Sequence, residues 1–244
     1  MFFYRQVSAP SPLPTGYTYR YDSSDIATIT TANGAVSSWA STGTITSSIV
    51  QPGSFKRPTH SSSPAGVTFT LDPDIARNDF MEIANRDFRG SNTEWYVATV
   101  VTVNSTLSQT AGTGVNFAGE GAYTNGGIWQ TSSGWAGLLL YTSGSISYAD
   151  ANNYPNSAST PIPLATKILL RARLKSGKVG IALNNNSYTE KNTSASGGFP
   201  AAKMFVGSSA YRYFDGIIHD FVVYPSVPAN ESALVSALST KWGI

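Results

Sequence analysis

Carboxylates carry the chemistry of most sugar-cleaving enzymes, which place an acid and a nucleophile or base about 5–10 Å apart. The chain has 14 Asp and Glu residues, and only residues at i, i+2 and i+4 share one face of a strand. Asp72 and Asp74 have this spacing, but Pro73 between them indicates a turn. Asp215 and Asp220 are an odd number of positions apart, so an unbroken strand would turn them opposite ways. We therefore expect no catalytic residues and no enzyme.

Other catalytic groups are also scarce. The chain has no cysteine and two histidines, His60 and His219, which excludes a thiolate nucleophile, a disulfide and a cysteine zinc site. No G-x-S-x-G elbow and no glycine-rich phosphate loop occurs. His219 lies in the apolar segment GIIHDFVVY, where it should face away from Ile218. We expect His219 to be either structural or exposed to solvent.

Aspartates near predicted loops are the remaining candidates for binding a cation, since Ca²⁺ takes carboxylate and carbonyl oxygens. They form no EF-hand-like string, and aspartate commonly caps turns. We expect no cofactor and no metal, with one bound calcium ion as the alternative. The aspartates concerned are Asp22, Asp25, Asp72, Asp74 and Asp150.

Two tryptophans on a polar background are the best candidates for stacking on a sugar ring. Trp129 and Trp135 flank a segment of Gln, Thr, Ser and Gly, and Tyr123 precedes them. Core packing is the favoured interpretation, because tryptophan usually buries most of its area. A glycan site, as the alternative, is predicted at Trp129, Trp135 and Tyr123. The other tryptophans are assigned to the core: Trp39, Trp95 and Trp242.

The first 16 residues are predicted to form an extended arm. Three alternating prolines, from Pro10 to Pro14, fix φ and remove backbone donors, which disfavours both a helix and a central strand. The arm begins with three consecutive aromatic residues, which water would solvate poorly and which should dock on this domain or on a partner. The residues predicted to bind a partner are Phe2, Phe3 and Tyr4.

Short strands separated by turn residues follow from residue 17 onward. Several segments alternate apolar and polar residues or are continuously apolar, and Gly, Asn, Ser or Pro bound them, as is typical of strands. Many short strands in succession favour a sandwich. The clearest strands are expected at 66–71, 96–103, 167–174, 178–183 and 216–224, with a hairpin turn at Ser176-Gly177.

One helix is predicted at the C-terminal end. Leu234, Leu238 and Trp242 are four residues apart and therefore share one helical face. Asn230 is a suitable N-cap, and Gly243 is a suitable residue to end the helix.

Composition limits the classes of partner. Charged residues form 12% of the chain, about half the usual ~25%, and the net charge of +2 is far from a nucleic-acid-binding balance. The apolar N-terminal run stops after four residues, too short for a signal peptide, and no run approaches the ~18 apolar residues of a membrane span. We expect a soluble protein without nucleic-acid or membrane partners.

Three stretches of the sequence resemble one protein family. Gly34–Trp39 fits "G-x-V-x-x-W", and Arg57-Pro58 followed by Val67–Phe69 fits an "RP" turn with a "V-x-F" strand. Phe214–Tyr224 and Lys241–Gly243 fit "F-x-G-x-I-x-E-x-x-V-Y" and "K-W-G". Together they resemble the concanavalin A-like lectin/glucanase (laminin-G-like jelly-roll) superfamily, in the form found in phage and bacterial surface proteins. Asp220 stands where the family often carries Glu, and Leu71-Asp72-Pro73 replaces its Phe-Asp-Gly.

The resemblance implies an all-β fold, a two-sheet antiparallel jelly-roll sandwich over residues 17–244, with a short C-terminal helix and the extended N-terminal arm of residues 1–16. It does not fix function, because this fold carries many activities. We expect a non-catalytic structural or binding protein on the surface of a bacteriophage virion, as a capsid decoration or tail-associated domain that contacts other virion proteins through its arm. Such a protein would be a homo-oligomer or part of a larger assembly, with host glycans as an additional expected ligand. The alternatives are an extracellular bacterial lectin-like module and, less favoured, a glycoside hydrolase.

Overall fold

The computed structural model describes residues 12–244 with gaps. The gaps are residues 52, 54–56, 71–80, 84–93, 105–114, 118–119, 124, 132–136, 142–144, 150–158, 193–203 and 210–211. For the strands between residues 115 and 160, and for residues 83, 204–205, 208–209 and 212–213, the backbone is described without the side chains.

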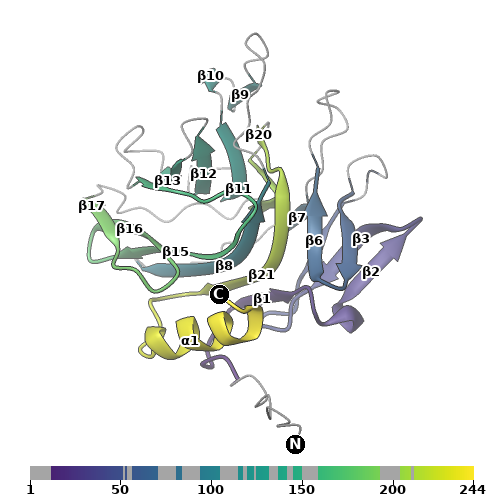
Figure 1. Cartoon of the computed structure of the whole chain (residues 1–244), viewed down its shortest axis with the longest axis horizontal. Helices are drawn as coiled ribbons and strands as arrows, with labels where there is room; N and C mark the ends of the chain where they lie inside the picture. The colour runs from purple at the N-terminus through teal and green to yellow at the C-terminus, as the bar shows by residue number, and fades with distance from the viewer. Residues whose placement is uncertain are drawn as a thin grey trace, which may run out of the picture.

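A curved back sheet forms the base of the molecule (Figure 1). Its strands, in spatial order, are β17 (Thr189–Asn192), β16 (Lys178–Leu183), β15 (Lys167–Lys175), β8 (Trp95–Val103), β21 (Gly216–Tyr224) and β1 (Tyr19–Asp22). On the edge of β21 that faces away from β8, the second half of the strand pairs with β1 and the first half pairs with β6 (Ala65–Phe69). Strand β6 also forms a hairpin with β5 (Thr59–Ser62). All these pairs are antiparallel.

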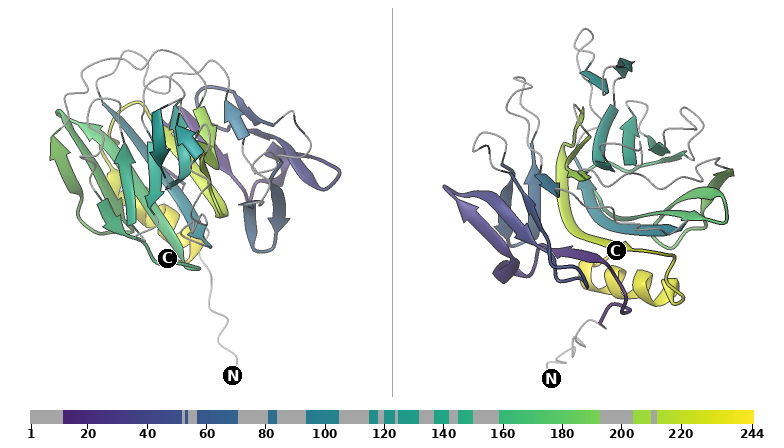
Figure 2. Two further views of the ribbon diagram at one scale, coloured as in Figure 1. Left: turned by 90° about the horizontal axis from the view of Figure 1, so that it is seen from above. Right: turned by 180° about the vertical axis from the view of Figure 1, so that it is seen from behind.

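A second run of antiparallel strands begins beside the back sheet, and its later strands lie over the concave side of that sheet (Figures 1 and 2). In spatial order it contains β2 (Ile29–Ala32), β3 (Ala35–Ala40), β4 (Ser48–Val50), β7 (Met81–Ile83), β18 (Met204–Val206), β11 (Asn125–Thr131), β12 (Gly137–Tyr141), β13 (Ser145–Ala149) and β14 (Ser159–Pro161). The pair Ala35–Thr59 links β3 to β5 and joins the two layers at one side. Smaller elements are η1 (Ile26–Thr28) and the two-stranded pairs β9 (Val115–Phe117) with β10 (Glu120–Tyr123) and β19 (Ser208–Ser209) with β20 (Arg212–Tyr213).

The position of β8, which is covered on both faces, explains why its sequence is almost continuously apolar. Trp95 and Val97 belong to the core between the sheets, whereas Tyr96 and Ala98 belong to a second cluster on the outer face of the back sheet. Because successive strand residues point to opposite faces, a strand covered on both faces loses the usual alternation. The tryptophans assigned to the core from the sequence are all buried: Trp39, Trp95 and Trp242.

Helix α1 (Glu231–Trp242) covers the outer, convex face of the back sheet (Figure 2). Leu234, Leu238 and Trp242 pack in the outer cluster, as their four-residue spacing predicts. Gly243 ends the helix with φ of 70°, a left-handed conformation that glycine adopts without strain. Asn230 occupies the N-cap position, but its backbone carbonyl, rather than its side chain, accepts the first helical hydrogen bonds.

The expected antiparallel sandwich with a C-terminal helix is therefore confirmed, whereas residues 1–11 of the predicted arm lie outside the described residues. The structure is an antiparallel two-sheet sandwich with one C-terminal helix, and the five strands expected most clearly correspond to β6, β8, β15, β16 and β21. The Ser176-Gly177 turn joins β15 to β16, with both residues at positive φ.

Candidate functional site

Two of the three residues predicted to bind glycans, Trp129 and Tyr123, fall in described strands. Trp129 is in β11, next to a register shift, opposite Leu138 of β12 and Val206 of β18. Trp135 falls between β11 and β12, outside the described residues, and Tyr123 ends β10. The side chains of Trp129 and Tyr123 are also outside the description, so this site stays a prediction.

The buried carboxylate of Asp220 organises a cluster of charges on the outer face of the back sheet. Its Oδ2 atom accepts hydrogen bonds from Arg20 Nη2 at 3.1 Å, Lys241 Nζ at 3.2 Å and Trp242 Nε1 at 3.1 Å. Asp22 adds a second carboxylate, which pairs with Arg20 at 2.9 Å and also binds Lys241. Two cations and two anions thus join β1, β21 and the end of α1.

This cluster gives the closing sequence motif a structural role. Asp220 occupies the motif's acidic position, and Lys241 and Trp242 are its "K-W" pair. Burial by itself would raise the pKa of the Asp22 carboxyl. The hydrogen bonds from Lys241 and Ser24, with the charges of Lys241 and Arg20, outweigh burial and hold that pKa below its ordinary value.

A second charged cluster surrounds the ring of Tyr188 at the other end of α1. Arg171 pairs with Glu231 at 2.6 Å, and Arg173 pairs with Glu190 at 2.9 Å. The guanidinium carbons of Arg171 and Arg173 lie 4.9 and 3.7 Å from the centre of the Tyr188 ring, within cation–π range. Both arginines of β15 are thus paired within the fold, and Arg171 is buried.

Both histidines make structural contacts. The Nδ1 atom of His219 lies 2.6 Å from the carbonyl oxygen of Ala65, which only accepts, so Nδ1 is the donor. Its Nε2 atom lies 3.0 Å from the Thr102 hydroxyl. His219 is 2% exposed, so of the two alternatives the structural one is confirmed. His60 Nε2 contacts the Ser23 carbonyl oxygen at 2.9 Å.

Within the described part of the chain, no group of three or more His, Asp or Glu side chains is arranged to hold a metal ion. Of the aspartates considered for calcium, Asp22 is engaged with Arg20 and Lys241. Asp72, Asp74 and Asp150 lie outside the described residues.

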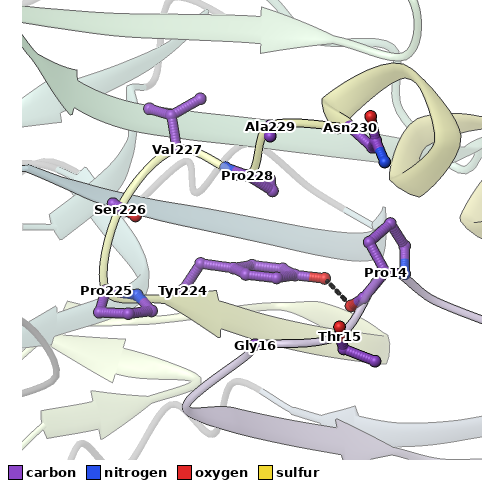
Figure 3. Close-up of a pocket in the computed structure, with 10 residues that line it drawn as sticks. All are labelled: Pro14, Thr15, Gly16, Tyr224, Pro225, Ser226, Val227, Pro228, Ala229 and Asn230. Atoms are coloured by element: carbon purple, nitrogen blue, oxygen red, sulfur yellow. Dashed lines mark hydrogen bonds between the residues drawn. The ribbon is translucent and has the colours of Figure 1, made fainter.

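An open pocket lies where the arm meets the domain (Figure 3). Pro14, Thr15 and Gly16 form one wall, the β21–α1 connection of residues 225–230 forms the other, and Tyr224 lies between them. The Tyr224 hydroxyl donates a hydrogen bond to the Pro14 carbonyl at 2.8 Å, and burial raises the pKa of this phenol, so it stays a donor. We call this cavity of about 530 Å³ the arm-root pocket.

A smaller pocket of about 240 Å³ adjoins the arm-root pocket on the other side of Thr15 and Gly16. Tyr17 and the loop Thr42–Thr44 complete its lining. The loop is held against the free edge of β1, because the amides of Thr42 and Thr44 donate to the carbonyls of Arg20 and Tyr17 at 2.9 and 3.1 Å. A ring, three hydroxyl-bearing threonines and no charged group are suited to a neutral polar ligand.

The residues of these two pockets carry no sequence motif. Their parts come from positions 14–17, 42–44 and 224–230, which only the folded chain brings together. The one available signal is the proline-rich connection Pro225–Asn230, which marks a rigid loop before the helix. The predicted partner-binding residues Phe2, Phe3 and Tyr4 lie outside the described residues.

Comparisons with known proteins identify the fold. No protein-family model and no curated protein matches the sequence. The binding domain of botulinum neurotoxin DC, solved with rat synaptotagmin II, aligns with a TM-score of 0.60 at 7% identity, over 92% of this chain and 52% of that chain. The Trypanosoma rangeli sialidase, solved with the inhibitor DANA, aligns with a TM-score of 0.60 at 12% identity, over 96% of this chain and 36% of that chain.

These similarities show that the chain has the concanavalin A-like jelly-roll fold that its sequence resembles. The chain spans about half the length of the neurotoxin binding domains and about a third of the sialidase. At identities of 7% and 12% these two similarities define the fold class, a jelly roll, and nothing finer. No helix in the described residues is long and apolar enough to cross a membrane.

Proposed function

We propose that this chain is a non-catalytic, lectin-like domain that binds glycans. The observation that carries the proposal is its fold. The botulinum neurotoxin DC binding domain, with which it shares this fold, has been solved in complex with SialylT. Entry of botulinum neurotoxin type C depends on two ganglioside molecules, and the T. rangeli sialidase has been solved with sialic acid.

Ion pairs of four described carboxylates, Asp22, Asp220, Glu190 and Glu231, support binding without hydrolysis. A glycosidase needs one carboxyl group to protonate the leaving oxygen and a second as nucleophile or base. Asp22 and Asp220 are engaged with Arg20 and Lys241 on the outer face. Glu190 and Glu231 are likewise paired with arginines. Release of reducing sugar from any polysaccharide by the purified chain would contradict this part of the proposal.

The predicted sugar platform is the β11–β12 hairpin with Trp129 and Trp135, together with Tyr123. A glycan array tests it directly, with wild type compared with Trp129→Ala, Trp135→Ala and Tyr123→Ala. We expect one glycan class to bind and at least one tryptophan variant to lose the signal, because ring stacking on a sugar is lost. Trp129→Phe is the matched control that retains a ring, and thermal unfolding of each variant separates loss of the site from loss of the fold.

The smaller pocket is a second candidate for the glycan site, since it combines Tyr17 with three threonines and no charge. Tyr17→Ala and Thr44→Val on the same array test it. Loss of binding in these variants, with binding kept in the tryptophan variants, would move the site there. A wild-type chain that binds no glycan would overturn the proposal.

The setting that we propose is the surface of a bacteriophage virion, as a head decoration or a tail-associated domain. It is supported by the family form that the sequence resembles, by the sparsely charged Ser/Thr-rich composition and by the added arm. Particle images with and without this chain, and incorporation of a variant lacking residues 1–16, test the setting. Unchanged incorporation of that variant would contradict an attachment role for the arm. Detection of the chain free in the medium of a particle-free bacterial culture would favour an extracellular lectin-like module.

A further inference from the structure

The arm-root pocket and the smaller pocket share one wall. Thr15 and Gly16 line both, with the cavity of about 530 Å³ on one side and the cavity of about 240 Å³ on the other. Gly16 carries no side chain, and a Cβ added to it would meet no atom within 4 Å. The wall is therefore a narrow ridge with open space at Gly16, and one elongated ligand can lie across it in both pockets.

Contacts with β21 hold this shared wall in place. The Tyr224 hydroxyl donates to the Pro14 carbonyl at 2.8 Å (Figure 3), and the Thr18 amide donates to the Val223 carbonyl at 2.7 Å. The Tyr17 ring meets the Tyr224 ring edge-on, with the ring centres 6.0 Å apart. The wall is thus fixed at both of its ends, and a preformed wall lowers the entropy that a ligand must overcome to bind.

The lining of the arm-root pocket mixes apolar and polar groups. The Asn230 side chain makes no capping hydrogen bond to α1, so its amide is available to a ligand as both donor and acceptor. A sugar ring presents hydroxyl groups at its edge and C–H groups on its faces, and so it matches a lining of both kinds. The apolar side chains are those of Pro14, Pro225, Val227, Pro228 and Ala229, and the polar ones include those of Thr15, Ser226 and Asn230.

The absence of charge in the lining favours an uncharged sugar. No described Asp, Glu, Lys, Arg or His lines either pocket. The charges that act on the Tyr224 phenol, those of Arg20 and Asp220, are paired with each other at 3.1 Å. The carboxylate of an acidic sugar such as sialic acid would therefore lose water without gaining a cationic partner, which is unfavourable.

The edge of β1 beside the smaller pocket is already closed, which argues against an extended peptide as the ligand. A peptide that adds a strand needs the unpaired backbone groups of a sheet edge. The loop Thr42–Ile45 takes these groups, because its amides donate to the carbonyl oxygens of Tyr17, Thr18 and Arg20 at 2.9–3.1 Å. The remaining hydrogen-bonding groups of the two pockets are side-chain hydroxyls and an amide, which suit the hydroxyls of a sugar.

We propose that the two pockets are adjoining subsites for consecutive units of an uncharged oligosaccharide. One unit lies against the half-buried ring of Tyr17 in the smaller pocket. The chain of sugar units crosses the ridge at Gly16, and the next unit lies in the arm-root pocket, where Ser226 and Asn230 bind its hydroxyls. This inference rests on the proposed glycan-binding function and adds to it a place and a ligand class.

Matched probes test the ligand class. They are a glycan array that presents the same glycans with and without terminal sialic acid, and calorimetry with cellotriose, maltotriose and N-acetylchitotriose. We expect uncharged glycans to bind, with an affinity that changes less than about twofold between about 50 and 500 mM NaCl, because no ionic contact is screened. Binding that requires sialic acid, or that falls about tenfold over this range of salt, would overturn the inference and leave glycan binding intact. A chain that binds none of these sugars would overturn both.

Substitutions in the arm-root pocket test the two subsites. Ala229→Trp adds a large side chain to the wall of this pocket, and Ala229→Ser is the matched control. We expect Ala229→Trp to weaken binding of the trisaccharide about tenfold and to leave binding of its monosaccharide in the smaller pocket unchanged. Asn230→Ala should weaken the trisaccharide by about two- to tenfold, the effect of one hydrogen bond.

The shared wall provides the last comparison. Thr15→Val should weaken both the trisaccharide and the monosaccharide, whereas Thr31→Val, at an exposed position on β2, should weaken neither. Thermal unfolding confirms that each variant is folded. If Ala229→Trp binds the trisaccharide as wild type does while Trp129→Ala or Trp135→Ala loses it, glycan binding stands and the two-pocket site is overturned.

Discussion

The carboxylate of Asp220 links three elements near the two ends of the domain, β1, β21 and α1. Asp220 lies in β21, is fully buried, and accepts hydrogen bonds from side chains of β1 and α1. An isolated buried charge is strongly unfavourable, so the cluster is stable only when both signs are present. Asp22 balances the second cation.

We predict that Asp220→Asn destabilises the fold by about 3 kcal/mol, at the lower end of the range for breaking a buried ion pair, because Arg20 and Lys241 keep Asp22 as a partner. Urea unfolding measures the loss. Asp220→Glu, which restores the residue common at this motif position, should recover most of the stability, and Asp25→Asn is the control for removing a carboxylate nearby. A loss below about 0.5 kcal/mol for Asp220→Asn would show that the cluster is not structural.

The imidazole of His219 makes stability depend on pH. Burial lowers the pKa of this group, with the charge of Lys167 acting in the same direction and the hydrogen bond to Ala65 opposing. The folded protein thus binds this proton less tightly than the unfolded chain does. The stabilisation is full above the unfolded value of about 6.5 and is lost as pH falls through that value toward the folded one.

We therefore predict that wild type loses stability between pH 7.5 and pH 5.5 and that His219→Gln loses less over the same interval. Urea midpoints at both pH values check this, with His60→Gln as the control for the other histidine. Parallel losses in wild type and His219→Gln would assign the pH dependence to other groups. Acid loss at lower pH is expected to continue through Asp22, whose lowered pKa favours the folded state only while the carboxylate is ionised.

The loop after β3 is the element that closes the edge of β1. Gly43 approaches β1 so closely that an added Cβ would overlap the Thr18 carbonyl and lie 2.7 Å from the Cα of Tyr19. Glycine is required here by the close approach of two backbones and not by an unusual φ. The same contact places Thr42 and Thr44 beside Tyr17 in the smaller pocket.

We predict that Gly43→Ala destabilises the protein by about 1–3 kcal/mol, the usual range for overpacking, and widens the smaller pocket. Gly53→Ala is the matched control, since its Cβ would meet only the Gln51 side chain at an ordinary 3.4 Å. Thermal unfolding of both variants measures the difference. Equal stability of the two variants would show that the loop moves away from β1 without loss.

The elements were predictable where one local pattern decided them. Alternation and apolar runs located β6, β15 and β8, and the spacing of Leu234 and Leu238 located α1. The register shift between Ile218 and Asp220 was not predictable, because it inserts a residue that no local pattern marks. It brings His219 and Asp220 to the helix-covered side together, as their shared contacts with Trp242 show.

The pockets were not predictable for a different reason. Tyr224 and Pro14 are separated by 210 positions, and each is unremarkable in its own segment. Their meeting depends on the pairing of β1 with β21, which the sequence suggests only as part of a fold. The glycan platform at Trp129 and Trp135 is the reverse case, a local pattern whose side chains lie outside the described residues.

At the scale of the whole molecule, both ends of the domain are tied to one another. Lys241, near the last residue, binds Asp22 in the first strand, and the core between the sheets includes residues from β1, β8 and β21. A shared core and linked ends favour unfolding of residues 17–244 as one unit, although the length of 244 residues exceeds the range in which small domains usually do so.

We predict a single cooperative transition, in which tryptophan fluorescence and far-UV circular dichroism give the same urea midpoint. The fluorescence is informative because Trp39 lies in the second sheet, Trp95 in the back sheet and Trp242 in the helix. Trp242→Phe should leave the two curves coincident while lowering the midpoint, since it removes the Nε1 bond to Asp220. Two separated transitions would mean that the sheets unfold independently. If the earlier of two fluorescence transitions is absent in Trp242→Phe, that transition belongs to the helix. A single transition would show that the outer cluster, which joins α1 to β1 and β21, is as much part of the domain as the core between the sheets.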